Sequence, residues 1–410
     1  MIKTLKFGGT SVGSADNMRR VGDIIIAQNA RLTVLSAMSG TTDALLSITN
    51  DELDKIALLE EKYTRCIGEL LGDSAEAQKA YLESFDVIRN SKNPHKIIAQ
   101  GEILTTKIFA LHLAQRGMKC EWLYAPDFVV MDNQGHARVF MPEIEDDTFY
   151  ITQGFICADQ RGAISNLGRG GSDYSAALMG VAIGADQVQI WTDIDGMHTG
   201  DPRFVEGTHP IATMSFDQAA ELAYFGAKIL HPSTILPCRE GQVDVLLKNT
   251  MDPTAPGTLI TGCGDDKVTF LAAAAKDNIT LVRITSDRML LAYGFLRHVF
   301  EVFERHSTPI DMITTSEVAV AITVDDITHI EAIKSELSEL GHIQIESQNS
   351  IVCVVGHMGY DQSGLASKIF DTIKTVPVKM VSYGASHRSV SLLVDSAHKR
   401  EVLQLLNSLF

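Results

Sequence analysis

The sequence predicts an α/β protein in which a mostly parallel sheet covered by helices is followed by a smaller, duplicated region. Three observations support this prediction. In the first part, short apolar strands alternate with helices, which is typical of a parallel sheet. A glycine- and acid-rich stretch at residues 261–266 then indicates a linker. Beyond it, a strand, a glycine turn, a helix and a proline-led strand occur twice in the same order.

The alternation in the first part is regular enough to place individual elements. Pro94 opens the longest helix, because proline is favoured at the first helical position, and the apolar residues that follow recur at helical spacing. The predicted elements are a strand at Thr4–Phe7, a helix at Asp16–Gln28, a strand at Leu32–Leu35, the helix from Pro94 to about Gln115, and strands at Phe149–Thr152 and Val188–Trp191.

The duplicated region contains two units of the βαββ type, which commonly pair through their sheets. Pro309-Ile310-Asp311-Met312 in the first unit corresponds to Pro377-Val378-Lys379-Met380 in the second. Chance similarity of two strand–helix–strand segments is the alternative. The predicted elements are Ile279–Ile284, Phe295–His306 and Val318–Val324 in the first unit, and Ile351–Val355, Leu365–Thr375 and Val390–Val394 in the second.

Composition excludes several classes of function. The formal net charge of -16 disfavours nucleic acid and anionic membranes as partners. The 6 cysteines form no Cys-x-x-Cys pair and no His-Glu-x-x-His motif occurs, so we expect a reducing compartment and no structural metal site. The N-terminus predicts a strand rather than a signal peptide, which favours a cytoplasmic protein.

The first glycine-rich loop, Lys6-Phe7-Gly8-Gly9-Thr10-Ser11, follows a predicted strand. Ligands of open α/β sheets bind at the carboxyl ends of strands. Glycines let backbone N–H groups approach an anion, and a lysine can stabilise charge on a transferred phosphoryl group. An ordinary strand-to-helix turn would show the same residues. The loop is not a Walker A motif, whose Gly-x-x-x-x-Gly-Lys-Ser/Thr pattern is absent from the sequence.

A second loop, Gly168-Arg169-Gly170-Gly171-Ser172-Asp173, combines glycines with polar side chains. Ser172 or Asp173 is expected to cap the helix that follows. Arg169 can form a bidentate pair with a carboxylate or phosphate, and Asp173 can orient a lysine. A capped helix after a glycine turn is the alternative.

Glu102 and three polar segments later in the chain are further candidate binding residues. Glu102 flanks the apolar stripe of the helix opened by Pro94 and needs a cationic partner there, such as a substrate ammonium; a surface glutamate is the alternative. The segments Trp191–Gly196, Asp201–Arg203 and Phe225–Pro232 offer carboxylates, an arginine and a lysine, as surface turns also do. Cations and glycine loops with few candidate bases suit phosphoryl transfer to a carboxylate, which needs no general base.

Taken together, these motifs resemble the aspartate kinase family, in its monofunctional lysine-sensitive subtype. The resemblance covers essentially the whole chain. It implies the amino acid kinase fold in residues 1–262 and two ACT domains in residues 263–410, the first at about 276–346 and the second at about 265–275 plus 347–410. The segments that match in order are Lys6–Val12, Gly168–Tyr174, Trp191–Asp193, Phe225–Pro232 and Ile313–Val318.

The resemblance implies transfer of the γ-phosphoryl group of ATP to the side-chain carboxylate of L-aspartate, the first step of lysine, threonine and methionine biosynthesis. Lys6 and Asp173 would be the catalytic pair. Magnesium would bridge the phosphates without a dedicated protein site, and no tightly bound cofactor is expected. Aspartate would be held by Ser36, Thr42, Glu102 (on the ammonium), Arg169 (on the α-carboxylate) and Ser172, and ATP by Lys6, Gly8, Gly9, Thr192, Asp193, Arg203 and Lys228.

The resemblance also implies feedback inhibition by lysine and a homodimer formed through the ACT domains. Ala292 and Pro309 replace polar residues expected near the effector, which keeps threonine open as a different effector. His198 stands where the family often has tyrosine near the nucleotide base. The effector site would comprise Met289, Gly294, Phe295, Leu296, Asp311, Thr315, Ser316 and Glu317.

Two other functions compete with this interpretation. A different member of the same fold, such as an N-acetylglutamate or uridylate kinase, would lack both the Gly168–Asp173 segment and the tandem repeat. A catalytically silent amino acid sensor would not need to keep both Lys6 and Asp173.

Overall fold

The computed structural model describes residues 1–410 except 50–51, 146, 227–233, 265–267, 290–292 and 360–361. By its internal packing the chain divides into two units. The first comprises Met1–Met197, Pro210–Phe216 and Leu230–Gly264, and the second comprises His198–His209, Asp217–Ile229 and Asp265–Phe410. The second unit therefore takes in two segments that precede the boundary expected at residues 262–263.

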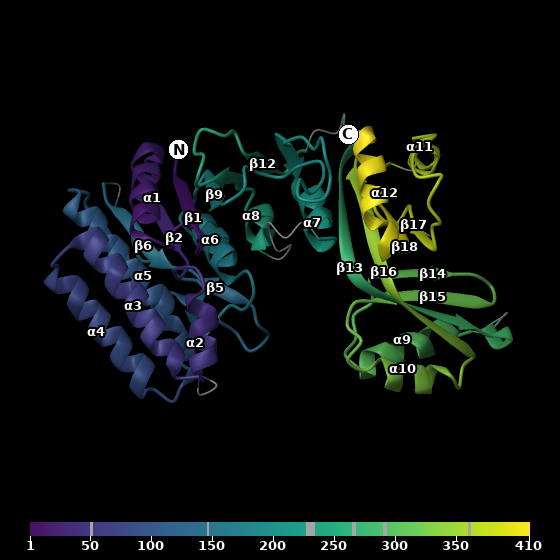
Figure 1. Ribbon diagram of the computed structural model, residues 1–410, viewed down its shortest axis with the longest axis horizontal. Coiled ribbons are helices and arrows are strands. Elements are labelled where there is room, and N and C mark those ends of the chain that lie inside the picture. Colours follow the sequence, from purple (N-terminus) through teal and green to yellow (C-terminus); the bar gives the residue numbers. More distant parts are fainter. Residues whose placement is uncertain (50–51, 146, 227–233, 265–267, 290–292, 360–361) are drawn as a thin grey trace. The chain divides into compact units, whose positions relative to one another are not determined.

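Within the described residues, the first unit is built on a sheet of eight strands (Figure 1). Neighbouring strands run parallel, except for the antiparallel pair β11 and β12, so the predicted mostly parallel sheet is confirmed. The strand order is β10 (Thr213–Ser215), β12 (Thr258–Thr261), β11 (Asp244–Asn249), β9 (Gln187–Thr192), β1 (Lys3–Phe7), β2 (Leu32–Leu35), β6 (Phe149–Gln153) and β3 (Cys120–Leu123).

Helices and a small sheet complete the first unit. The helices are α1 (Ala15–Gln28), α2 (Thr41–Thr49), α3 (Asp54–Leu71), α4 (Ala75–Asn90), α5 (Pro94–Gln115), α6 (Gly171–Ala182) and α8 (Leu236–Glu240). The small sheet has the order β5 (Ala137–Val139), β4 (Val129–Met131), β7 (Ile156–Ala158) and β8 (Ile164–Asn166).

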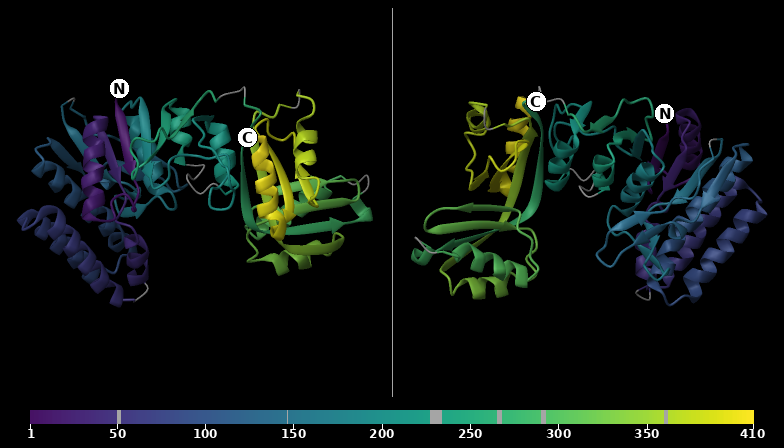
Figure 2. Two further views of the ribbon diagram at one scale, coloured as in Figure 1. Left: turned by 45° about the horizontal axis from the view of Figure 1, so that its top comes forward. Right: turned by 180° about the vertical axis from the view of Figure 1, so that it is seen from behind.

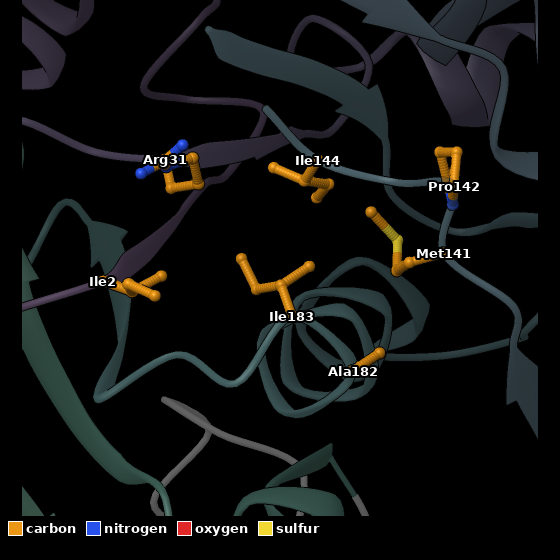
Figure 3. A pocket seen from close by; sticks show the side chains of 7 residues that line it. All are labelled: Ile2, Arg31, Met141, Pro142, Ile144, Ala182 and Ile183. Atoms are coloured by element: carbon orange, nitrogen blue, oxygen red, sulfur yellow. The ribbon is translucent and has the colours of Figure 1, made fainter. Parts of the chain in front are cut away.

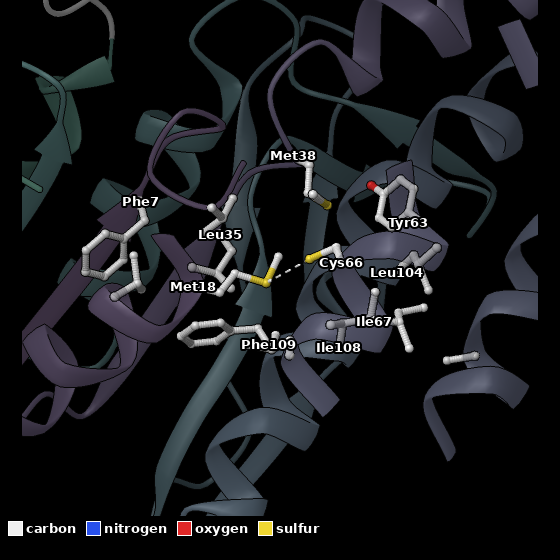
Figure 4. Close-up of a cluster of buried hydrophobic side chains, with 14 of the residues drawn as sticks. Phe7, Met18, Leu35, Met38, Tyr63, Cys66, Ile67, Leu104, Ile108 and Phe109 are labelled. Carbon is white, nitrogen blue, oxygen red and sulfur yellow. Dashed lines mark hydrogen bonds between the residues drawn. The ribbon is translucent and has the colours of Figure 1, made fainter. Parts of the chain in front are cut away.

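The main core of this unit lies between the sheet and helices α1, α3, α4 and α5. Figure 4 shows Phe7 and Leu35 of the sheet near Met18 of α1, Cys66 of α3 and Phe109 of α5. The sulfur atoms of Met18 and Cys66 lie 3.9 Å apart. These side chains are fully or almost fully buried.

The opposite face of the sheet is covered by α6. Successive side chains of a strand point to opposite faces, so Thr4 and Lys6 face away from the core that buries Leu5. Gly180 of α6 packs close to the Thr4 side chain on this second face. The alternation of β1 therefore directs Lys6 toward α6.

Helix α5 has the limits that the sequence predicts. The Asn93 side chain accepts the backbone N–H of His95 at 3.0 Å, and Pro94 occupies the first turn. Among the described residues, α5 is the helix that is long and apolar enough to cross a membrane, and 78% of that stretch is buried inside the protein. It is thus a core helix of the first unit.

The second unit contains a sheet of six strands over the described residues. The strands β13 and β16 run through it as long neighbours (Figures 1 and 2). The order is β14 (Met312–Thr315), β15 (Ala319–Val324), β13 (Phe270–Thr285), β16 (His342–Gly356), β18 (Ser389–Asp395) and β17 (Met380–Ser382), and the helices are α9 (Phe295–Arg305), α10 (Ile330–Leu337), α11 (Leu365–Thr372) and α12 (Lys399–Leu406).

Each long strand serves both predicted repeats. The later half of β13 pairs with β15 of the first repeat, and the later half of β16 pairs with β18 of the second. The βαββ order is confirmed in both. Helix α11 ends at Thr372 rather than at the predicted Thr375, and residues 373–375 continue as a turn before Pro377.

Helix α7 (Phe216–Tyr224) connects the two units along the chain. It begins directly after β10 of the first unit, while the rest of the helix packs within the second. A Cβ atom at Gly226, just after α7, would lie 2.1 Å from the carbonyl oxygen of Ala275 in β13. Only glycine permits this approach, so the end of α7 is held against β13.

Candidate active site

The strand register assembles one edge of the first sheet from residues far apart in sequence. Phe7 lies opposite both Leu35 and Trp191, and all three are the last or next-to-last residues of their strands. The predicted site residues Gly8, Ser36 and Thr192 follow them directly. The backbone N–H of Ser36 donates to Phe7 (3.1 Å) and that of Gly8 to Trp191 (3.4 Å). The carboxyl edge of the sheet is therefore the candidate active site.

Lys6 and Asp173 form an ion pair at this edge, with 2.6 Å between Nζ and Oδ1. Both side chains are largely shielded from solvent, at 12% and 15% exposure. Lys6 comes from β1 and Asp173 from the first turn of α6. The structure thus brings together the two residues expected to form the catalytic pair.

Glu102 is buried, with only 2% exposure, so the surface alternative raised for it does not hold. Its Oε1 accepts the backbone N–H of Ala37 at 3.3 Å. Its Oε2 is also buried and has no hydrogen-bond partner among the described residues. Burial raises the pKa of Glu102 to about 8, although the hydrogen bond from Ala37 opposes the shift. The site thus holds a carboxyl oxygen that lacks a donor.

The loop between β2 and α2 is fixed against α5 beside Glu102. The Thr105 hydroxyl, one turn after Glu102, accepts the backbone N–H of Met38 at 3.3 Å. It also lies 3.1 Å from the Tyr63 hydroxyl. A Cβ at Gly101 would be 2.9 Å from the Cβ of Ala37, so glycine is required for this close packing. Ser36 and Thr42, in and after this loop, are both partly buried.

The start of α6 differs from the sequence-based expectation. Gly170, in a left-handed conformation with φ of 73°, precedes the helix, and no side chain caps it. Ser172 and Asp173 lie in the first turn instead, because the Asp173 carboxylate is engaged by Lys6. Arg169 is exposed, and no ion pair to it occurs among the described residues. An exposed guanidinium next to the Lys6–Asp173 pair is available to an anionic ligand.

Most of the expected nucleotide-binding residues belong to the first unit. Thr192 and Asp193 lie at the carboxyl end of β9, where their side chains are joined by a 3.0 Å hydrogen bond. Arg203 belongs to the second unit and forms a bidentate ion pair with Asp201. Lys228 lies outside the described residues.

The expected effector residues lie in the first repeat. Asp311 is buried, with a side-chain exposure of 1%. Its Oδ1 accepts Nζ of Lys276 at 2.6 Å and the Tyr224 hydroxyl at 2.8 Å, while Oδ2 is buried without a hydrogen-bond partner among the described residues. Among the other expected effector residues, Phe295 and Leu296 begin α9 directly after Gly294, and Met289 lies in the short helical turn before them. At the end of β14 and in the turn that follows it, three expected residues are exposed: Thr315, Ser316 and Glu317. Ala292 lies outside the described residues.

The equivalent position in the second repeat carries the opposite charge. Lys379 stands where the first repeat has Asp311, and it pairs with the Glu346 carboxylate and with Asn349 Oδ1, the latter at 2.7 Å. Asp395 lies 3.5 Å from Lys379. The two repeats share a fold but not the charge of this site.

A separate cavity of about 310 Å³ lies at the opposite, amino-terminal edge of the first sheet (Figure 3). Ile2 and Arg31, which precede β1 and β2, line it together with Ile144 and Ile183. It is therefore remote from the Lys6 edge. In the described part of the chain, no group of three or more histidine, cysteine, aspartate or glutamate side chains is placed to hold a metal ion.

Comparison with known proteins agrees with this fold. The model of the amino acid kinase family matches residues 1–249, and that of the ACT domain matches residues 352–410. The chain is 33% identical to the lysine-sensitive aspartokinase 3 of Escherichia coli over 98% of both chains, and 31% identical to the chloroplastic aspartokinase 3 of Arabidopsis thaliana over 99% of this chain and 81% of the relative.

Solved structures give the same result. The E. coli aspartokinase III complex with aspartate and ADP superposes with a TM-score of 0.84, at 30% identity over 100% of both chains. The complex of that enzyme with lysine and aspartate gives a TM-score of 0.80, at 31% identity over 100% of this chain and 99% of the other. The fold and the Lys6 edge thus define a member of the amino acid kinase family. Within that family the chain belongs to the aspartokinases.

Three residues that hold the surroundings of Glu102 and Asp311 in place were not identified from the sequence: Thr105, Tyr224 and Lys276. Thr105 is visible in the sequence as a polar residue one turn from Glu102 in an apolar helix, and this spacing was the available signal. Tyr224 and Lys276 gave no such signal, because they are 87 and 35 residues from Asp311.

The buried Glu102 carboxyl predicts a pH-dependent stability. Its pKa rises from 4.5 to about 8 on folding, so the stability that it contributes is complete below pH 4.5 and is lost as the pH approaches 8. The amide in Glu102→Gln does not ionise. Without aspartate, we expect the unfolding free energy of this variant to exceed that of the wild type increasingly from pH 5 to pH 8, by on the order of a few kcal/mol at the end.

Urea unfolding at four pH values measures this difference. Saturating aspartate should reduce it at pH 8, since the substrate ammonium would stabilise the wild-type carboxylate. A difference that does not change with pH would show that Glu102 ionises normally in the folded protein.

Proposed function

We propose that the Lys6–Asp173 pair carries out the aspartokinase reaction at the carboxyl edge of the first sheet. As an aspartokinase, the chain is an ATP-dependent kinase that phosphorylates the side-chain carboxyl group of aspartate. The observation that carries the assignment is the shielded ion pair beside two glycine-rich turns. Lys6 stabilises negative charge on the transferring phosphoryl group, and Asp173 holds the lysine in position. The acceptor carboxylate is already ionised at neutral pH and needs no base.

Aspartate is proposed to bind between α5 and α6. Oε2 of Glu102, which has no hydrogen-bond partner in the described part of the chain, receives the α-ammonium. The exposed guanidinium of Arg169 receives the α-carboxylate as a bidentate pair. Ser36, Thr42 and Ser172 supply hydroxyl groups around the substrate. Binding of the ammonium converts Glu102 to its ionised form, because a nearby positive charge lowers the pKa of a carboxyl group.

ATP is proposed to bind as its magnesium complex. Gly8 and Gly9 admit the phosphates next to Lys6, and Thr192 and Asp193 lie at the end of the neighbouring strand β9. Magnesium prefers phosphate oxygens, water and one or two carboxylates to a complete protein cage, and Asp193 is exposed at this edge. ADP is a ligand of the related E. coli structure. Roles for Arg203 and Lys228 remain predictions.

The second unit is proposed to bind L-lysine as a feedback inhibitor. The buried Oδ2 of Asp311 has no hydrogen-bond partner in the part of the chain that the structure describes, and it suits an α-ammonium, as Oε2 of Glu102 does in the first unit. In the described residues of the second repeat, the equivalent position is occupied by Lys379, which would repel a cation. Lysine is a ligand of the related E. coli enzyme. Threonine is the competing effector and is tested in the same assay.

Assembly and location follow as further proposals. The strand β14 is an edge strand with exposed Ile313, and Val318 is exposed in the following turn. An exposed, partly apolar edge can pair with a second chain, so we propose a homodimer through the ACT region. The six free cysteines suit a reducing compartment such as the cytoplasm.

Removing the Lys6 ammonium should abolish turnover. For Lys6→Ala we expect a loss of about 3 kcal/mol or more of barrier stabilisation, more than a hundredfold in kcat, with unchanged circular dichroism. Lys3→Ala is the matched control, since Lys3 lies in the same strand but pairs with Gln28 at the other end of it. Near-normal turnover of Lys6→Ala in a coupled ADP-release assay would refute the assignment.

Removing the Glu102 carboxylate should weaken the binding of aspartate but not the binding of ATP. In Glu102→Gln we expect KM for aspartate to rise at least tenfold, from the loss of about 1.5–3 kcal/mol in a charged hydrogen bond, while KM for ATP stays constant. Wild-type kcat/KM for aspartate should rise from pH 6 to about 8 as Glu102 ionises, and the variant should lack this rise. Equal increases in both KM values would instead indicate a general disturbance of α5.

Removing the Asp311 charge should abolish inhibition by lysine. Feedback coupling is typically worth about 1–3 kcal/mol, so we expect Asp311→Asn to shift the half-inhibitory lysine concentration at least about fivefold upward. Asp371→Asn, on the exposed side of α11, is the control. If millimolar lysine does not inhibit the wild-type kinase activity, or if threonine inhibits it instead, lysine is refuted as the effector. Unchanged inhibition of Asp311→Asn would refute the site.

A further inference from the structure

Two residues outside the expected effector set hold Asp311. Lys276, at the end of the first half of β13, places its ammonium 2.6 Å from Asp311 Oδ1 and 2.9 Å from Asp325 Oδ2. Tyr224, the last residue of α7, donates its hydroxyl to the same Oδ1 at 2.8 Å. The Lys276 ammonium also lies 4.6 Å from the centre of the Tyr224 ring. One carboxylate oxygen is thus saturated by the chain itself, and the other is left for a ligand.

We propose that Lys276 and Tyr224 form a conformational switch: when an effector ammonium binds to Asp311, the contacts of these two residues change, and the change is transmitted to helix α7. This inference rests on the proposed binding of an amino acid ammonium at Asp311 Oδ2. It extends that proposal by naming the residues that couple binding to inhibition.

The electrostatics of Asp311 drive the switch. Without effector, the Lys276 ammonium balances the buried Asp311 charge. A second ammonium at Oδ2 places two cations on one carboxylate, and like charges at this distance in a buried site repel strongly. Lys276 has another partner in Asp325, which is 39% exposed and lines an open cavity of about 790 Å³. The effector therefore displaces Lys276 from Asp311 toward Asp325.

The displacement reaches α7 through Tyr224. Two interactions of the Tyr224 side chain involve the switch, the hydrogen bond to Asp311 and the cation–π contact with Lys276, while its ring also packs edge-on against neighbouring Phe225. Burial, with a further contribution from Asp311, raises the pKa of Tyr224 to about 12, so its hydroxyl remains a donor. A change at Asp311 thus alters the contacts of the last residue of α7.

Helix α7 is well placed to pass the change to the kinase unit. It begins at Phe216, directly after β10 ends at Ser215. From β10, hydrogen-bonded strands continue through β12, β11 and β9 to β1, which carries Lys6. The amide of Gln218 in α7 also donates to Gly356 of β16 at 3.3 Å. The helix therefore contacts both repeats of the second unit while it continues a strand of the first.

The test separates binding from inhibition. Lysine affinity is measured by calorimetry, and kinase activity is measured with and without saturating lysine, on the full-length chain. Tyr224→Phe removes only the hydroxyl, and Tyr383→Phe is its control, because Tyr383 has similar exposure (39% against 43%) in the same unit. Lys276→Met removes the competing cation, and Lys379→Met is its control at nearly equal exposure (21% against 20%).

We expect Tyr224→Phe to keep the wild-type activity without lysine and to bind lysine within about threefold of the wild type, while its activity at saturating lysine rises at least about fivefold. Lys276→Met should bind lysine at least about threefold more tightly, because the internal competitor is gone, and should be inhibited less at saturation. Both controls should behave as the wild type.

Each contrary result has a distinct meaning. If the wild type is inhibited by lysine and Tyr224→Phe is inhibited equally, the switch is refuted while the effector site stands. Weaker lysine binding by Lys276→Met would show that Lys276 supports the site rather than competes for it, and would also refute the switch. If the wild type neither binds lysine nor responds to it, the proposed effector fails and the inference fails with it.

Discussion

The ion pair between Lys6 and Asp173 is the interaction on which the arrangement of the candidate active site depends. A partly buried cation and carboxylate stabilise each other only when they stay close, since loss of either partner leaves an uncompensated charge. The pair therefore fixes the first turn of α6 against the carboxyl end of β1. That turn also carries Ser172, and Arg169 lies just before it, so one contact places two of the five residues proposed to surround aspartate.

Each of the two units contains a buried carboxyl group with one oxygen that lacks a hydrogen-bond partner among the described residues. Glu102 in the first unit and Asp311 in the second are buried carboxylates, each with one oxygen held by the protein and the other without a partner in the described residues. An unpaired buried acceptor destabilises the unliganded protein. A ligand ammonium would remove this penalty, so an amino acid bound at either proposed position would also stabilise the fold.

Local sequence patterns predicted the helices and strands well, because the start and length of each element are determined largely by neighbouring residues in the sequence. Asn93 and Pro94 define the start of α5, and the period of its apolar residues defines its length. The burial of Glu102 could not be settled this way, because a helical stripe does not show that α2, α3 and α4 cover the remaining sides of α5. The expected start of α6 was wrong: Ser172 or Asp173 was expected to cap the helix, whereas Gly170 stands at the cap position. The Asp173 side chain pairs with Lys6, the partner also expected for it from the sequence. Tyr224 and Lys276 approach Asp311 only through the tertiary fold.

The exchanged charges of the two repeats have a consequence for dose response. Duplication produced two similar halves, but Asp311 in one half corresponds to Lys379 in the other, which is already neutralised by Glu346. In the described residues of the two repeats, the proposed effector therefore has one such position, at Asp311, and its binding to a single chain would follow a simple hyperbola. Any Hill coefficient above one must then arise between chains, from the association of several copies, and not from two sites that cooperate within one polypeptide.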